Sequence, residues 1–320
     1  MMNRLNQILI VLLVIQIAVV AFVFWPQSAA TDGGPLLADF AASEVVELTL
    51  EDNEGNSLTL AKRGDSWILP NGGDFPANET TISEFLTKLE AVTTNRLVTQ
   101  TDASHDRLQV GNREFNRLVK MSTSNGTNQW LYLGSSAGAG ATHIRIADQP
   151  EVYLTNEVTA FDAGTVASGW IETLFHAVPQ ENVLAITLEN SQGTFNFAKS
   201  GETWSMAGLA ADEIFNEAGV TSLLNQVSSV QMSNPLGTDV ETSFGLDTPA
   251  ATVIVVTEEE GQSRSYTLQI GAQRGDNYVA TSSESPYFVE VSGFTGNNFV
   301  NKTRADFLQA PPVEGDGSGG

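Results

Sequence analysis

The chain has 320 residues, and 41% of them are hydrophobic, which is enough to build a core in each of two ordinary domains. Its net charge of -23 has the wrong sign for binding a nucleic-acid backbone, so we expect no nucleic-acid partner. Because the chain contains no cysteine, disulfides, thiolate metal sites and cysteine nucleophiles are excluded.

An apolar run opens the chain. Residues 8–25 read ILIVLLVIQIAVVAFVFW, and as a helix they would span about 27 Å, close to the hydrocarbon thickness of a bilayer. We therefore predict a single transmembrane anchor there, preceded by a cytoplasmic N-terminus at residues 1–7. Arg4 before the run and the acidic chain after it place the protein in the inner membrane, with its bulk in the periplasm. A cleaved signal peptide is the alternative, because Ser28-Ala29-Ala30 is compatible with a cleavage site.

The chain after a linker, predicted at residues 26–42, repeats itself with an offset of about 137 residues, which is the size of a domain. The sequence VELTLE at residues 46–51 matches LAITLE at residues 184–189. Trp67 and Trp204 then follow an Ala-Lys pair and a glycine in both copies. The repetition indicates two tandem copies, at residues 43–176 and 177–308.

Both copies continue with apolar residues at positions i, i+3, i+4, i+7 and i+10, a spacing that predicts one amphipathic helix in each. These residues are Ile82, Phe85, Leu86, Leu89 and Val92 in the first copy, and Val220, Leu223, Leu224, Val227 and Val230 in the second.

Strand-like runs follow each helix. Each copy is then predicted to finish in a closing helix, ending at Thr173-Leu174-Phe175 and at Asp306-Phe307-Leu308. This order predicts the α+β class, with a mostly antiparallel sheet, one main helix and one closing helix in each copy. The joint between the copies is predicted at residues 176–180, and residues 309–320 are predicted to form a disordered tail.

One turn in the second copy carries a family resemblance. Phe244-Gly245-Leu246-Asp247-Thr248-Pro249 is similar to the "GL-acid-x-P" turn of the domain of unknown function 4340 (DUF4340) family, and Ile270-Gly271 with Tyr278-Val279 fits that family's later "IG…YV" pattern. The first copy reads Asp106-Arg107-Leu108-Gln109-Val110 at that place, without the glycine or the proline. The resemblance implies a membrane-anchored protein associated with an ABC-type transport system related to gliding-motility exporters.

The motifs of common catalytic and metal sites are incomplete here. Gly134-Ser135-Ser136-Ala137-Gly138 matches a nucleophile elbow, but a strand follows it where that motif requires a helix. His105, His143 and His176 lack metal-ligand spacing, and Asp52-Asn53-Glu54-Gly55 lacks the later glutamate of a calcium loop. We therefore assign no catalytic, cofactor or metal residues, and with no P-loop lysine we expect no nucleotide.

The remaining candidates have a structural interpretation. Trp67 and Trp204 are predicted to be core anchors, although a sugar-stacking platform is the alternative. The turn residues Phe244, Gly245, Leu246, Asp247 and Pro249 are predicted to shape the fold.

Three functions remain open. The first is a non-catalytic, membrane-anchored extracytoplasmic accessory or scaffold protein with ABC-type transporter subunits as partners. The second is an extracytoplasmic module that binds a peptide or a glycan. The third is a hydrolase, for which buried carboxylate pairs with perturbed pKa values would be the sign.

Overall fold

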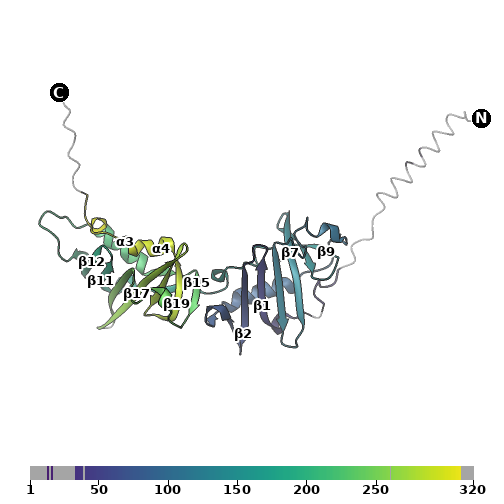
Figure 1. The fold of residues 1–320 in the computed structure, drawn as a ribbon, viewed down its shortest axis with the longest axis horizontal. Coiled ribbons are helices and arrows are strands. Elements are labelled where there is room, and N and C mark those ends of the chain that lie inside the picture. Colours follow the sequence, from purple (N-terminus) through teal and green to yellow (C-terminus); the bar gives the residue numbers. More distant parts are fainter. Residues whose placement is uncertain (1–12, 14–15, 17–32, 39, 260, 311–320) are drawn as a thin grey trace, which may run out of the picture. The chain divides into compact units, whose positions relative to one another are not determined.

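The computed structural model describes residues 33–38, 40–259 and 261–310, together with Leu13 and Gln16 (Figure 1). This part of the chain contains nineteen strands and three α-helices. The strand pairs are antiparallel in both large sheets. The mostly antiparallel sheets with few helices confirm the predicted α+β class.

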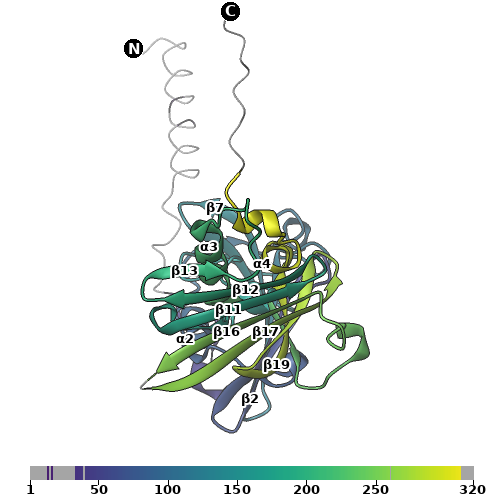
Figure 2. The same ribbon diagram turned by 90° about the vertical axis from the view of Figure 1, so that its left-hand side faces the viewer.

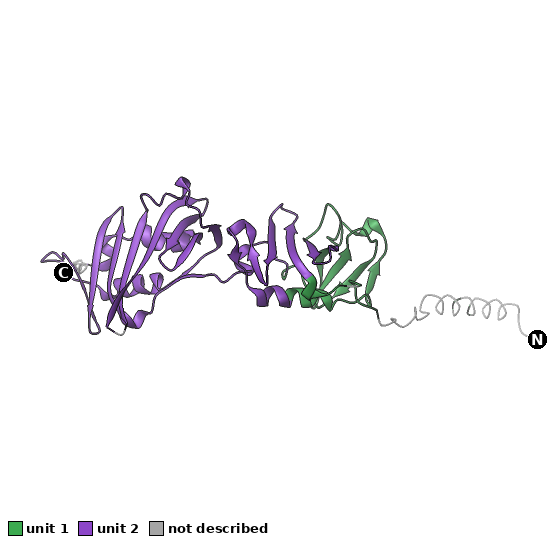
Figure 3. Ribbon diagram, turned by 90° about the horizontal axis from the view of Figure 1, so that it is seen from below, with its two compact units in different colours: residues 1–44, 85–118, 129–162 green, residues 45–84, 119–128, 163–320 purple. Residues whose placement is uncertain are grey.

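The chain forms two compact units (Figure 3). Unit 1 comprises Met1–Glu44, Phe85–Leu118 and Gln129–Asp162, whereas unit 2 comprises Val45–Glu84, Val119–Asn128 and Ala163–Gly320. Each unit therefore gathers segments that lie far apart in the sequence. The predicted domain boundaries at residues 43–176 and 177–308 stay a prediction.

The largest sheet contains nine strands in the order β4-β3-β2-β1-β6-β7-β8-β9-β5. Its strands are β1 Val45–Asp52, β2 Ser57–Arg63, β3 Ser66–Leu69, β4 Phe75–Pro76, β5 Leu97–Thr99, β6 Arg117–Thr123, β7 Asn128–Gly138, β8 Ala141–Ile146 and β9 Val152–Thr155. Val45, Leu48 and Leu50 of β1 are buried, and from Leu48 on buried residues alternate with the half-buried Thr49 and Glu51.

The second large sheet contains eight strands in the order β13-β12-β11-β16-β17-β18-β19-β15, and Figure 2 shows β13, β12, β11, β16 and β17 side by side. Its strands are β11 Val183–Asn190, β12 Gly193–Ser200, β13 Thr203–Met206, β15 Asn234–Gly237, β16 Ala251–Glu259, β17 Gln262–Arg274, β18 Asn277–Ser282 and β19 Ser285–Ser292. A separate two-stranded ribbon pairs β10 Leu174–Ala177 with β14 Ser229–Gln231.

The two large sheets have the same strand order. Apart from β4, the series β3-β2-β1-β6-β7-β8-β9-β5 corresponds strand by strand to β13-β12-β11-β16-β17-β18-β19-β15. The register of their hairpins also agrees, because Trp67 lies opposite Lys62 and Trp204 lies opposite Lys199.

Both predicted amphipathic helices are confirmed. They are α2, Glu79–Glu90, and α3, Glu217–Val227. The first four predicted apolar residues of each helix are buried: Ile82, Phe85, Leu86 and Leu89 in α2, and Val220, Leu223, Leu224 and Val227 in α3. The fifth residue of each set is also buried but lies after the helix, because α2 ends before Val92 and Val230 lies in β14. The Asn216 side chain caps α3 by accepting a hydrogen bond from the Ala218 N–H.

The predicted closing helix of the first copy is wrong. Residues 156–173 contain only the short 3-10 helix Ala167–Gly169, and the expected helix end at Thr173–Phe175 runs into β10. The second copy does have the helix α4, Gly293–Val300, which Ser292 caps by accepting from the Thr295 N–H. It ends earlier than predicted, because Asp306 and Phe307 belong to a separate 3-10 helix, Arg304–Phe307. In the first copy the Trp170 indole N–H instead donates to the Gly164 carbonyl and closes a loop.

The N-terminal part of the described chain is packed within unit 1, although we expected a linker there. The Leu36 N–H donates to the Val92 carbonyl at 2.7 Å, and Leu36, Leu37 and Phe40 are buried. Apart from Leu13 and Gln16, the predicted anchor at residues 8–25 lies outside the described residues, as does most of the predicted tail. Within the described part of the chain, no helix is both long enough and apolar enough to cross a bilayer.

Unit 1 also contains a small second core, which positions the site described below. It is formed where the loop before β6 covers β7 and β9, and its buried members are Leu108, Val110, Leu118, Tyr132 and Val152.

Candidate functional site

The family-motif turn of the second sheet is tightly packed. Phe244 is only 1% exposed, and its ring lies 5.3 Å from that of Phe288. Gly245 follows with a left-handed backbone, φ 64°, and donates its N–H to the Thr242 carbonyl at 3.2 Å. A Cβ on Gly271 in β17 would lie 2.1 Å from the Phe244 carbonyl oxygen. The close approach of turn and strand therefore requires glycine in the strand.

The first sheet keeps this turn although its glycine and proline are missing. Gln109 has φ 57° and donates its N–H to the Asp106 carbonyl at 3.0 Å, as Gly245 does to Thr242. A Cβ on Gly134 in β7 would lie 2.3 Å from the Leu108 carbonyl oxygen, which is the approach made by Gly271. Gln109 thus adopts a conformation that favours glycine.

The other predicted structural residues differ in their exposure to solvent. Asp247 is exposed, and Pro249 is half-buried. Trp67 and Trp204 are each 6% exposed, so neither presents an open ring face for a sugar. Their role as core anchors stays a prediction.

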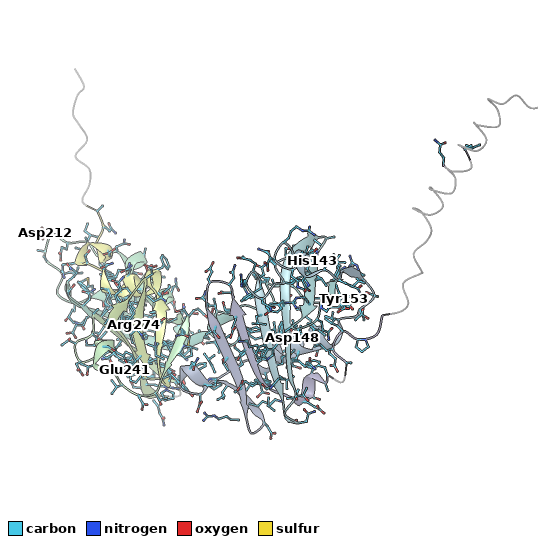
Figure 4. The ribbon with its side chains drawn as sticks, turned by 45° about the vertical axis from the view of Figure 1, so that its right-hand side comes forward. His143, Asp148, Tyr153, Asp212, Glu241 and Arg274 are labelled. Atoms are coloured by element: carbon cyan, nitrogen blue, oxygen red, sulfur yellow. The ribbon has the colours of Figure 1, made fainter. Side chains whose placement is uncertain are left out.

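A cavity of about 500 Å³ opens beside the turn of the first sheet. Its walls come from the loop before β6, from β8 and from the turn after β8. Figure 4 labels two residues of this region, His143 on β8 and Asp148 in the following turn. The polar lining residues are Asp102, His105, Asp106, Asn112, Arg113, Arg145 and Asp148.

Arg145 is the buried cation of this cavity, with 3% of its surface exposed. Its guanidinium donates to the Val110 carbonyl at 2.7 Å, to the Gln149 carbonyl at 3.0 Å and to the Asn112 side chain at 2.8 Å. It also lies 4.7 Å from the centre of the Tyr132 ring. Burial lowers the pKa of Arg145, but a guanidinium remains charged at any physiological pH.

Two histidines lie in unit 1, and each donates to a different backbone carbonyl oxygen. The Nε2 of His105 lies 3.0 Å from the Pro150 carbonyl oxygen and must donate to it, because a carbonyl oxygen can only accept. The Nδ1 of His143 lies 2.8 Å from the Ser135 carbonyl oxygen and must donate there. The same nitrogen is 3.1 Å from the Ser135 hydroxyl, yet a protonated nitrogen cannot accept the hydroxyl proton. Ser135 and His143 are therefore not arranged as nucleophile and base.

The third histidine lies in unit 2. His176, expected in the joint between copies, is in β10 and fully buried, with its Nδ1 2.7 Å from the Ser282 hydroxyl. Its Nε2 is buried without a hydrogen-bond partner. Burial lowers the pKa of His176 from 6.5 to about 4, so the ring is neutral at pH 7.

The perturbed carboxylates all shift downward. Burial raises the pKa of Asp52, but hydrogen bonds from Asn56, Thr165 and Glu54 outweigh it and hold the pKa below its ordinary value. Asp52 thus closes the β1–β2 hairpin, the segment that resembles a calcium loop. A general acid at neutral pH needs the opposite shift. Across the described residues, no group of three or more His, Cys, Asp or Glu side chains is placed to hold a metal ion.

The two antiparallel sheets, each with its turn packed on a strand glycine, define a mostly antiparallel α+β protein. The family model named Domain of unknown function (DUF4340) matches residues 67–243, more than half of the chain, and the protein belongs to this family. The match begins in β3 and ends just before Phe244. No curated protein and no solved structure matches the chain.

Sequence reasoning missed Arg145 and Gln109. Arg145 lies in the strand sequence ATHIRI, whose burial is nearly continuous, and an arginine inside such a run is the one available signal. Gln109 gives no signal by itself, because only the alignment with Gly245 marks its place in the turn.

Proposed function

We propose that the protein is a non-catalytic, membrane-anchored accessory or scaffold protein on the extracytoplasmic side of the inner membrane. Residues 8–25 would hold it there with the N-terminus in the cytoplasm, and its two sheets would represent tandem copies of one domain. Its partners would be subunits of an ABC-type transport system related to gliding-motility exporters. The shared strand order supports the duplication, whereas the association with a transport system is what the family resemblance implies.

The observation that carries the partner-binding role is the aromatic side chain of Phe161, which is 94% exposed. The loop that presents it is fixed from both sides. Asp162 accepts hydrogen bonds from Lys88 of α2 at 2.6 Å and from the Thr159 N–H at 2.8 Å, and Val158 is buried. A large aromatic group held in water on a fixed loop is typical of the anchor residues of protein interfaces, because little conformational entropy is lost on binding.

A second exposed aromatic group supports the same function. Phe294 is 80% exposed at the first turn of α4, and the Ser292 cap fixes the start of this helix. Each unit thus presents one phenylalanine that its own core does not use.

Cross-linking from position 161 tests the partner. A photoreactive phenylalanine analogue would replace Phe161 in the full-length protein, and irradiated native membranes would be solubilised in mild detergent for mass spectrometry. Transporter subunits should be captured from position 161 and not from Gln192, an exposed residue of the β11–β12 turn. Recovery of the protein without any cross-linked partner from positions 161 and 294 would contradict the scaffold role.

Protease accessibility tests the orientation separately. Protease added to intact spheroplasts should digest the chain beyond the anchor, because the positive-inside rule places it outside the cytoplasm. Protection of that portion until the membrane is lysed would overturn the proposed topology.

The second candidate function is an extracytoplasmic ligand-binding module for a peptide or a glycan. The cavity at Arg145 favours it, because a buried guanidinium and several carboxylates line a space large enough for a small ligand.

A further inference from the structure

Arg145, the buried cation of the first-sheet cavity, has no carboxylate partner among the described residues. Asp102 and Asp148 are nevertheless near enough to raise the pKa of Arg145. Hydrogen bonds to three carbonyl oxygens and to Asn112 use four of the five N–H donors of Arg145. A buried charge is costly where it is not paired. One donor of this buried group is left for the cavity that Arg145 lines.

The second sheet shows that the fold does not require this arginine. Arg145 in β8 lies opposite Tyr132, and the corresponding pair in the second sheet is Thr281 opposite Gln269. The same strand position therefore accepts a short, half-buried side chain. Arg145 is therefore not required by the strand arrangement that the two sheets share.

Hydrogen-bond acceptors line the same cavity. Asp102, Asp106 and Asp148, whose carboxylates can only accept when ionised, line it. Asp106 is held against the backbone, because a Cβ on Gly111 would lie 1.9 Å from its Oδ1. Donors and acceptors thus share one small space.

We infer that this cavity binds a neutral saccharide segment. A simple anion would meet the three carboxylates, and a simple cation would meet the guanidinium groups of Arg145 and Arg113. A sugar hydroxyl donates and accepts at the same time, so neighbouring hydroxyls satisfy both kinds of group without adding charge. The volume of about 500 Å³ lies within the range of small-ligand sites. This inference rests on the ligand-binding function and is independent of the transporter partner.

Calorimetric titration of the full-length protein tests the inference, in a detergent without sugar headgroups. The probes are the neutral trisaccharides chitotriose, maltotriose and cellotriose, with inorganic phosphate as the anion and triglycine as the zwitterion. At least one trisaccharide should bind saturably, whereas phosphate and triglycine should not. Saturable binding of phosphate or triglycine alone, or of none of the probes, would overturn it. Failure of the cross-linking experiment would leave this result unaffected.

Charge-removing variants locate the binding. Asp148 has φ 65°, which asparagine tolerates, so Asp148→Asn should keep the fold. Asp148→Asn and Asp102→Asn should each weaken trisaccharide binding about tenfold by removing a charge-assisted hydrogen bond. Asp65→Asn, at an exposed turn between β2 and β3, is the matched control and should bind like the wild type. Equal trisaccharide binding by all three variants would refute the saccharide assignment.

Discussion

The turn at Leu108–Val110 and the turn at Phe244–Leu246 have the same backbone but different surroundings. Both place a left-handed residue second, and both press a carbonyl against a strand glycine, Gly134 or Gly271. In the second sheet the ring of Phe244 packs on that of Phe288, whereas in the first sheet Leu108 and Val110 pack in the small core around Tyr132, and the residues on either side of them line a polar cavity. Both sheets therefore retain the close approach of the turn to the strand glycine, whereas the side chains of the turn differ between them.

The largest effect is expected at the two strand glycines. Gly134→Ala and Gly271→Ala each place a Cβ within 2.3 Å of a backbone oxygen, so the turn must move away from the strand. Each variant should lower the free energy of unfolding by about 3 kcal/mol, as overpacking against backbone does. Urea unfolding of the full-length protein measures the loss, and hydrogen exchange with mass spectrometry assigns it to one sheet.

Gly169→Ala is the matched control for these variants, because nothing lies within 4 Å of a Cβ at that position. Its free energy of unfolding should stay within about 0.5 kcal/mol of the wild-type value. If Gly134→Ala were equally mild while Gly271→Ala was not, the two turns would not share the close approach.

Acid should destabilise the second sheet more than the first, by an amount close to that expected for the glycine variants. His176 binds its proton with a pKa of about 4 when folded and 6.5 when unfolded, so the unfolded state binds more protons between these values. The free energy of unfolding should therefore be constant above pH 6.5 and fall as the pH drops toward 4, by on the order of 3 kcal/mol. The first sheet has Ile146 where Ser282, the partner of His176, lies in the second.

Hydrogen exchange at pH 7, 5.5 and 4.5 measures this difference. Strands β17 and β18 should lose protection before β7 and β8 do, and His176→Gln should remove most of the pH dependence between 6.5 and 4. Simultaneous loss of protection in both sheets of the wild type, or an unchanged pH profile in the variant, would exclude His176 as the cause.

Arg145 offers a smaller and more local test. Arg145→Met keeps much of the contact with Tyr132 but leaves the Val110 and Gln149 carbonyl oxygens without their donor. We expect a loss of about 2 kcal/mol, the cost of unsatisfied buried acceptors, confined to the loop before β6. Arg113→Met, at an exposed position of the same loop, should change the free energy of unfolding little. Equal losses in the two variants would mean that Arg145 does not organise the loop.

Much of the fold could be predicted from the sequence because its signals are local. The spacing of the apolar residues from Ile82 to Leu89 and from Val220 to Val227 fits a helix and not a strand, and both helices form. A closing helix was predicted in both copies, and the one predicted in the first copy is absent from the structure. The segment at residues 156–173 contains Gly164 and Gly169 and the β-branched residues Val158, Thr159, Thr165 and Val166, all of which are poor helix formers.

The candidate site could not be predicted, because it depends on contacts between distant segments. Arg145 acquires its role only when Val110, Asn112 and Gln149 surround it. Likewise, Leu36 is in a predicted linker, and nothing local indicates that its N–H will bond to Val92.

The smallest effects are expected at the left-handed residue of each turn, where substitutions should change the free energy of unfolding in opposite directions. Gly245→Ala adds a Cβ at φ 64°, 3.0 Å from Ala272, and should destabilise the second sheet by about 1–2 kcal/mol. Gln109→Gly relieves a similar strain at φ 57° but increases the entropy of the unfolded chain, so the first sheet should gain about 0.5 kcal/mol. Urea unfolding of both single variants and of the double variant measures the two effects, which should be additive because the sites share no contact. Destabilisation by Gln109→Gly would mean that the glutamine side chain contributes more than the backbone strain costs, and that the first turn is held by side-chain contacts that the second does not need.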